Sequence, residues 1–271
     1  MKLRHLIALA LLAGVFIMEG FDIAAMGIAV PRLEEALGLE PASFGWVMTG
    51  ILVGLGVGGA TLAPLGDRFG RRALIVAGCL ATGLFTLATA TATTTTGFLL
   101  WRFLTGFALG ACLPNVSALS SEIAPPRLRA TVMAVVSAGI PLGLFIAGVV
   151  APAVIAAWGW QGLFYVPGAF ALLLAGVLMA VLEGGRPAAS ATAAQAPVGE
   201  KMPQLLLFKA PWLLPFTVFA MMLGLNALNL YLLNSWLPTV LPLAGLTLDA
   251  AAQVAGVANL AGLGIGIGAS F

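Results

Sequence analysis

The sequence is poor in charged residues. Of its 271 residues, 8% are charged and 61% are hydrophobic. Soluble domains carry about 25% charged residues, so this chain lacks the side chains needed for a water-facing surface. Its net charge of +2 forms no basic patch of the kind that binds nucleic acid. We therefore expect a lipid bilayer around the chain and no nucleic-acid partner.

Cysteine and histidine are also scarce, with two cysteines and one histidine. Cys79 and Cys112 fall in separate apolar segments, which argues against a disulfide framework or a metal site. We interpret both as small packing residues. The sequence offers no nucleophile–base pair, phosphate-binding loop or nucleotide-binding domain. We predict that the protein is not an enzyme, binds no cofactor or metal, and draws its energy from an ion gradient.

Long apolar runs dominate the rest of the sequence. A membrane-spanning helix needs about 20 mostly apolar residues, and seven or eight runs reach that length. The runs are continuous rather than alternating, which predicts spanning helices and not barrel strands. The predicted fold is an all-α polytopic membrane bundle. The predicted spans are Leu6–Val30, Phe44–Leu65, Ala73–Thr91, Gly97–Leu119, Thr131–Ala156, Gly162–Leu182, Leu213–Leu237 and Ala250–Phe271.

Lysine and arginine predict the orientation. With the N-terminus in the cytoplasm, ten of the 12 basic residues lie on the inner side, as the positive-inside rule requires. Arg32 falls in an outer loop and Arg102 within a span. The glycine- and alanine-rich composition favours a bacterial inner membrane. The ten inner residues are Lys2, Arg4, Arg68, Arg71, Arg72, Arg127, Arg129, Arg186, Lys201 and Lys209.

Three regions are expected. Residues 1–182 form a six-helix bundle, residues 183–210 an alanine- and proline-rich cytoplasmic linker, and residues 211–271 the first one or two helices of a second bundle. No charged residue follows Asp249 to close the last span. We therefore expect a chain truncated after its seventh or eighth helix.

The short inner loop after the second span reads Gly-Asp-Arg-Phe-Gly-Arg-Arg, from Gly66 to Arg72. Inner-side anchoring explains its arginines, but not Asp67 or the spaced glycines. The loop resembles the signature of the major facilitator superfamily, glycine-x-x-x-Asp-Arg-x-Gly-Arg-Lys/Arg, and departs from it at Ala63. The resemblance implies two six-helix bundles and a gating latch on the inner side. The implied latch residues are Gly66, Asp67, Arg68, Gly70, Arg71 and Arg72, with Glu122 as the partner of Arg71.

Within that superfamily, the chain looks most like the aromatic acid:proton symporters. Three segments carry the resemblance: Glu19-Gly20-Phe21-Asp22, Arg102–Ala130 and Asn229–Leu241. The sequence departs from the family at Glu19, where aspartate is usual, which keeps the carboxylate but adds a methylene.

Two acids share one face of the first span. Glu19 and Asp22 are three residues apart, and Glu19 lies about 20 Å from the inner end of the helix. Charges this deep in a bilayer are usually functional. Two ionised carboxylates on one face repel each other, so one is expected to take up a proton. We predict that this pair couples transport to protons, while a structural hydrogen-bonded pair is the alternative.

Substrate-binding candidates lie in the fourth and seventh spans. Arg102 is expected either to neutralise Asp22 or to bind a substrate carboxylate in fork geometry, although snorkelling to the interface is an alternative. A stripe of amides and an indole suits an aromatic acid, but such amides also join helices. This stripe comprises Asn226, Asn229 and Trp236, and Asn115 is a weaker candidate.

The predicted function is uptake of a small organic anion, namely a benzoate-type aromatic acid, together with protons. The mechanism would be alternating access, by a monomer when complete. Another facilitator, such as a sugar or dicarboxylate symporter or a drug exporter, is the first alternative. A non-transporting sensor on the same fold is the second. The fragment by itself is expected to be inactive.

Overall fold

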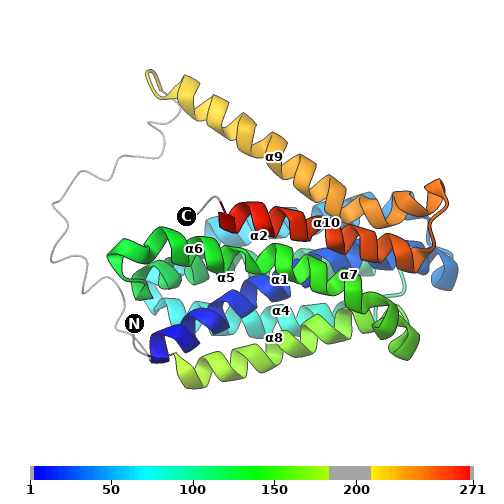
Figure 1. Cartoon of the computed structure of the whole chain (residues 1–271), viewed down its shortest axis with the longest axis horizontal. Helices are drawn as coiled ribbons and strands as arrows, with labels where there is room; N and C mark the ends of the chain where they lie inside the picture. The colour runs from blue at the N-terminus through cyan, green and yellow to red at the C-terminus, as the bar shows by residue number, and fades with distance from the viewer. Residues whose placement is uncertain (1–2, 183–208, 269–271) are drawn as a thin grey trace.

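A computed structural model describes residues 3–182 and 209–268 (Figure 1), and all regular elements there are helical. Short 3₁₀ turns cover Pro41–Ser43, Pro126–Leu128 and Leu241–Ala244. The helices are α1 (Leu3–Leu37), α2 (Phe44–Thr61), α3 (Leu65–Phe69), α4 (Arg71–Thr89), α5 (Thr95–Ile123), α6 (Arg129–Ser137), α7 (Gly139–Trp158), α8 (Gly162–Val181), α9 (Leu213–Val240) and α10 (Leu248–Gly268).

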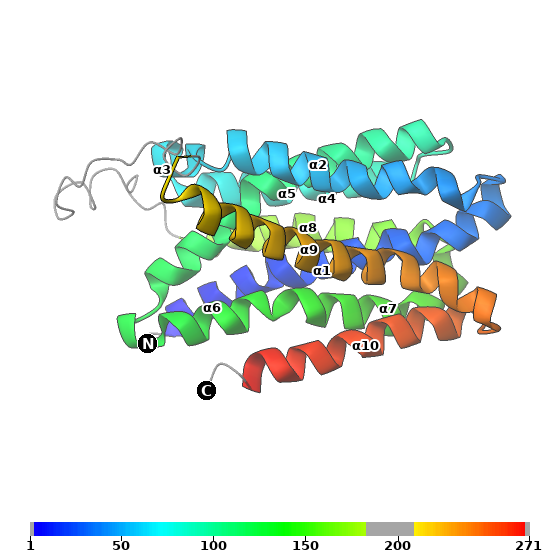
Figure 2. The same cartoon turned by 90° about the horizontal axis from the view of Figure 1, so that it is seen from above.

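The predicted helical membrane fold is confirmed. Seven segments of the described residues are long and apolar enough to cross a membrane, and they match the first seven predicted spans. The eighth predicted span forms α10, which is not among those seven. The long helices run side by side along the molecule (Figures 1 and 2). We call the end with α3 the inner end and the end with the α1–α2 connection the outer end, following the predicted orientation.

Glycine faces set the closest helix contacts. A Cβ atom built on Gly54 would lie 2.2 Å from the carbonyl oxygen of Phe103, so α2 and α5 pack backbone to backbone. A Cβ atom on Gly143 would lie 2.1 Å from the carbonyl oxygen of Ile17, which joins α7 to α1 in the same way. Small residues permit this approach where lipid supplies no hydrophobic driving force.

The predicted end of the first helix was wrong. Helix α1 continues past Val30 and through Pro31 to Leu37, so Arg32 is helical and 9% exposed rather than part of a loop. Its guanidinium donates hydrogen bonds to the Ile28 carbonyl at 3.1 Å and to Asp249 at 2.6 Å. These acceptors compensate the charge, which a pattern of hydropathy alone does not show.

The fifth predicted span is two helices. Helix α6 ends at Ser137 and α7 begins at Gly139, although together they still cover one membrane crossing. Pro141 has no backbone N–H to donate to the preceding turn, which explains why the helix breaks just before it.

Residues 209–268 contact residues 3–182 mainly in the outer half of the molecule. The predicted linker, including Arg186 and Lys201, lies outside the described residues apart from residues 209–210. Figure 1 shows the inner half of α9 diverging from the bundle. Nearer the outer end, a Cβ atom on Gly27 of α1 would lie 2.6 Å from the Ser235 carbonyl oxygen of α9.

Candidate functional site

A buried ion pair joins α1 to α5. The Nη1 atom of Arg102 lies 2.7 Å from Oδ1 of Asp22, and both residues are 1% exposed. Arg102 also donates through Nη2 to the Asp22 backbone carbonyl at 3.2 Å, and Thr86 donates to Asp22 Oδ1 at 3.4 Å. The structure shows the predicted neutralisation of Asp22 by Arg102, and not the alternative in which Arg102 snorkels to the interface.

The pair leaves some of its hydrogen-bonding capacity unused. Arg102 Nε and Asp22 Oδ2 are buried and have no hydrogen-bond partner among the described residues. An arginine fork can hold a carboxylate with two parallel bonds, whereas here a single donor reaches the carboxylate side chain. The guanidinium therefore keeps one donor, Nε, that has no partner among the described residues.

Glu19 lies one helical turn from Asp22 and is 3% exposed. Its Oε2 atom is buried without a hydrogen-bond partner in the described part of the chain. The three-residue spacing places its side chain on the same face of α1 as that of Asp22. Since an isolated buried carboxylate is costly, a neutral, protonated Glu19 fits this environment better than an ionised one.

A small cavity lies beside Arg102. It has a volume of about 20 Å³, which is room for about one water molecule. Its polar lining comes from Arg102 together with Tyr231 and Ser235 of α9. Apolar residues of α1 and α2 complete it, namely Ile23, Met26, Met48 and Ile51.

A larger cavity of about 470 Å³ adjoins the first, because the two share Met48, Tyr231 and Ser235. It lies between α2 and α9, and Trp236 and Thr49 also line it. Trp236 is one of the residues predicted from the sequence, whereas Tyr231 and Ser235 are not. The signal was present: two hydroxyl side chains four residues apart occupy one face of a predicted spanning helix.

Asn226 and Asn229 line neither of these two cavities. They line a different cavity, of about 330 Å³, between α9 and α10. Asn234 and Asn259 line it too, and Asn259 Nδ2 donates to Asn234 Oδ1 at 2.9 Å. Asn229 and Trp236 share a helical stripe but lie about 10 Å apart along the axis, so they meet different neighbours.

Asn115 is also remote from Arg102. Thirteen residues of α5, or about 20 Å, separate the two. The Asn115 amide donates to the carbonyls of Ala63 and Ala111 at 3.1 and 2.8 Å. A Cβ atom on Gly66 would lie 1.8 Å from Asn115 Oδ1, so the inner loop packs directly on this side chain. Through these contacts, Asn115 anchors the inner loop to α5.

The inner loop forms a small charge network. Arg71 pairs with Asp67 at 3.2 Å and with Glu122 at 2.9 Å, and the second contact confirms the predicted pairing. Gly70 has φ of +95°, a conformation that favours glycine. Its neighbours also make defined contacts: the Arg68 guanidinium lies 5.5 Å from the Phe69 ring centroid, and Arg72 donates to the Met179 carbonyl.

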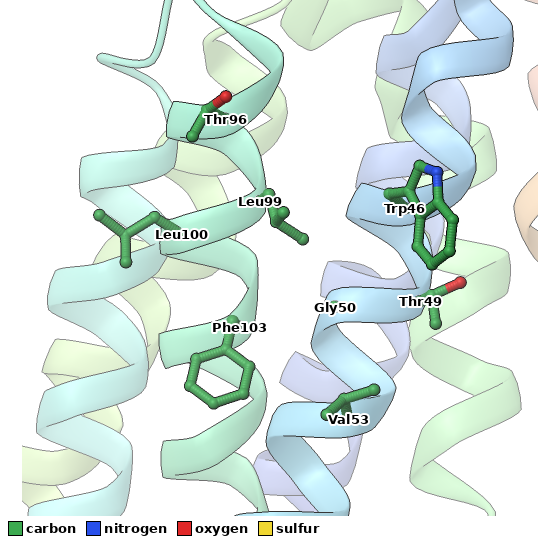
Figure 3. A pocket seen from close by; sticks show the side chains of 8 residues that line it. All are labelled: Trp46, Thr49, Gly50, Val53, Thr96, Leu99, Leu100 and Phe103. Atoms are coloured by element: carbon green, nitrogen blue, oxygen red, sulfur yellow. The ribbon is translucent and has the colours of Figure 1, made fainter.

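Another groove, of about 460 Å³, opens between α2 and α5 (Figure 3). It offers no charged group to an anion, and Thr49 and Thr96 carry its only side-chain oxygens. We therefore leave this groove out of the candidate site. Its lining is Trp46, Thr49, Gly50, Val53, Thr96, Leu99, Leu100 and Phe103.

The two cysteines, interpreted from the sequence as small packing residues in separate segments, are in contact. Cys79 Sγ and Cys112 Sγ lie 3.8 Å apart in the buried α4–α5 interface, and both are free thiols. Within residues 3–182 and 209–268, no group of three or more histidine, cysteine or acidic side chains is arranged to hold a metal ion.

Comparison with known proteins identifies the family. Residues 12–271 match the model of the Major Facilitator Superfamily. The chain belongs to this superfamily. This facilitator is 32% identical to the 4-hydroxybenzoate transporter PcaK of Pseudomonas putida over 93% of its own length. It is 34% identical to the 3-(3-hydroxy-phenyl)propionate transporter of Escherichia coli K12, again over 93% of its length.

The facilitator covers 62% of the first of these relatives and 60% of the second. Among solved structures, it superimposes on the D-xylose-proton symporter with a TM-score of 0.75 at 20% identity, covering 97% of this chain and 67% of that one. A bacterial homologue of the lysosomal transporter Spinster, in an inward-facing conformation, gives the same TM-score at 19% identity, with 97% and 61% covered. These likenesses show a shared fold.

Proposed function

We propose that the protein is a secondary active transporter that takes up a small aromatic acid together with protons. The observation that carries this proposal is the buried Arg102–Asp22 pair beside a cavity shared with α9. A permanently buried pair is weak evidence for stability, because desolvation offsets much of its attraction. An arginine with an unused donor at a cavity suits a site that binds and releases an anion.

Anion binding exchanges one carboxylate for another. The substrate carboxylate takes the fork of Arg102, and Asp22 is displaced from it. A displaced carboxylate inside the bundle has lost its counter-charge, so proton uptake stabilises it. Substrate binding and proton binding therefore favour each other, as coupled uptake requires.

Glu19 is the second proton carrier in this scheme. It is buried, unpaired at Oε2 and on the same face of α1 as Asp22. Protonation of Glu19 removes a negative charge from the path of an incoming anion.

The ring of the substrate fits the larger cavity beside Arg102. Its volume of about 470 Å³ accommodates a benzoate-sized molecule, and Trp236 supplies an aromatic wall. The Tyr231 hydroxyl and Ser235 lie between this cavity and Arg102. Similar proteins are named for transport of hydroxylated aromatic acids, including 4-hydroxybenzoate and gallate, which agrees with hydroxyl groups in the lining.

Alternating access of two bundles moves the site from one side to the other. We place residues 1–182 in one bundle, residues 211–271 in the second and residues 183–210 in the cytoplasmic linker. The N-terminus lies in the cytoplasm and the membrane is the bacterial inner membrane. The Asp67–Arg71–Glu122 network lies at the inner end, where the second bundle must approach to close that side.

Uptake by cells that express the full translation product of the gene tests the proposal. The panel contains benzoate, 4-hydroxybenzoate, a dicarboxylate and xylose, with and without a protonophore. Aromatic acid uptake that collapses with the protonophore supports it. Uptake of xylose or the dicarboxylate alone rejects the substrate class and keeps transport. No uptake of any compound by correctly inserted protein rejects uptake and favours export or sensing.

A further inference from the structure

The outer ends of the two parts of the chain are joined by a second ion pair. Arg32 Nη2, near the outer end of α1, lies 2.6 Å from Asp249 Oδ1, in the first turn of α10. The two residues are 217 positions apart in the sequence. We propose that Arg32 and Asp249 form an outer gate, a pair that is made when the outer side is closed and must break before the outer side opens. The proposal rests on alternating access.

Hydrogen bonds within α1 and at the start of α10 position both partners for this contact. Arg32 also donates to the Ile28 carbonyl of its own helix at 3.1 Å, which orients the guanidinium toward α10. Thr247 Oγ1 accepts from the backbone N–H of Ala250 at 3.2 Å and fixes the start of α10. The pair therefore forms without large side-chain rearrangement when the two helices meet.

The burial of the pair is unequal, which suits a reversible contact. The Arg32 side chain is 10% exposed, whereas that of Asp249 is 61% exposed. Limited exposure of the arginine reduces screening of the attraction. Because Asp249 is exposed, water can solvate its carboxylate as soon as the pair separates. Breaking the pair therefore leaves no desolvated anion inside the protein. The fully buried Arg102–Asp22 pair lacks this property.

Close backbone packing lies directly below the pair. A Cβ atom on Gly148 of α7 would lie 2.5 Å from the Ala252 carbonyl of α10 and 2.7 Å from Gly256 Cα. Ala251 and Ala252 are fully buried. In contrast, the first ten residues of α9, at the inner end, are almost entirely exposed. The two parts therefore meet tightly on the outer side, and any outward-open state must separate α10 from α1 and α7.

Accessibility from outside tests the gate without any transport measurement. Met26 is 3% exposed and lines the Arg102 cavity, so a cysteine placed there reports on outer opening. The parent is Met26→Cys with Cys79→Ala and Cys112→Ala, labelled in intact cells with a membrane-impermeant maleimide. We expect Arg32→Gln and Asp249→Asn each to raise the labelling rate about three- to ten-fold.

Two further variants separate gating from general damage. Arg32→Asp combined with Asp249→Arg restores the attraction with reversed signs, and its labelling rate is expected to return toward that of the parent. Glu35→Gln removes an exposed acid on the same helix end and is expected to leave the rate unchanged. The proposal is overturned if the two single variants label like the parent, or if the swapped pair labels as fast as the single variants. If these labelling changes appear but the parent takes up no aromatic acid, the result counts against the proposed function alone.

Discussion

Arg102 and Asp22 form an ion pair of 2.7 Å in which both side chains are almost completely buried, although the residues lie on different helices and 80 positions apart. The contact fixes α1 against α5 at the depth of the small cavity that Tyr231 and Ser235 also line. A charge pair at this position should affect both the stability of the protein and its uptake activity. The two effects can be measured separately.

Removing one partner should cost more than removing both. Asp22→Asn and Arg102→Gln each leave an uncompensated buried charge, at a cost of about 3–5 kcal/mol, whereas the double variant leaves none. We expect both single variants to lower the midpoint of thermal unfolding in detergent and the double variant to recover part of the loss. All three should lose uptake. Strictly additive losses of stability would show that the two charges are not coupled.

Glu19→Gln should uncouple substrate movement from the proton gradient. Glutamine keeps the size of the side chain but cannot exchange a proton, so exchange of labelled for unlabelled acid should continue while gradient-driven accumulation stops. Glu19→Asp keeps the carboxyl and should retain accumulation. The two activities are measured on the same membrane vesicles. Accumulation by the glutamine variant at the wild-type level would remove Glu19 from the proton path.

Tyr231→Phe should reduce the preference for hydroxylated acids. Losing one hydrogen bond costs about 0.5–1.5 kcal/mol, so we expect the ratio of apparent KM values for benzoate and 4-hydroxybenzoate to change about two- to ten-fold. The readout is inhibition of labelled uptake by each acid. Trp236→Leu is a useful comparison, because it should weaken the binding of both acids together. An unchanged ratio in Tyr231→Phe would place the ring hydroxyl elsewhere.

Two glycines of α2 offer a matched test of the packing. A Cβ atom on Gly54 would meet the backbone of α5 at 2.2 Å, while one on Gly56 would meet nothing within 4 Å. Gly54→Ala should therefore separate α2 from α5 and lower the unfolding midpoint clearly. Gly56→Ala should have little effect or raise it slightly, since alanine favours a helix. Equal effects of the two substitutions would contradict the close packing of α2 on α5.

The sequence predicted the helices well because lipid imposes a simple rule. Each crossing needs an apolar run of fixed length, and that rule located seven spans correctly. The rule failed where a charged side chain finds partners inside the protein, and where a proline breaks a helix within an apolar run. Arg32 remains helical because Asp249 and a carbonyl receive its donors, and that partner lies 217 residues away. The break before Pro141 lies inside an uninterrupted apolar run and leaves no mark in hydropathy.

The candidate site was predictable where its residues share a helix or a depth. Glu19 and Asp22 follow from their spacing, and Arg102 follows from its comparable depth. Asn226 and Asn229 were assigned to the same cavity as Trp236 from the helical stripe alone. A shared stripe shows that the side chains project in the same direction from one helix. It does not show which neighbouring helix each turn of that helix faces. Tyr231 and Ser235 emerge only when α9 is placed against α1 and α2.

The most direct test of the account is accumulation of labelled 4-hydroxybenzoate by the purified full translation product in liposomes. A pH gradient, acid outside, is imposed and then abolished with a protonophore, and the Asp22→Asn variant is measured in parallel. We expect accumulation above equilibrium that depends on the gradient and is lost in the variant. Equal internal and external concentrations with and without the gradient, in protein that binds the acid, would contradict proton-coupled uptake.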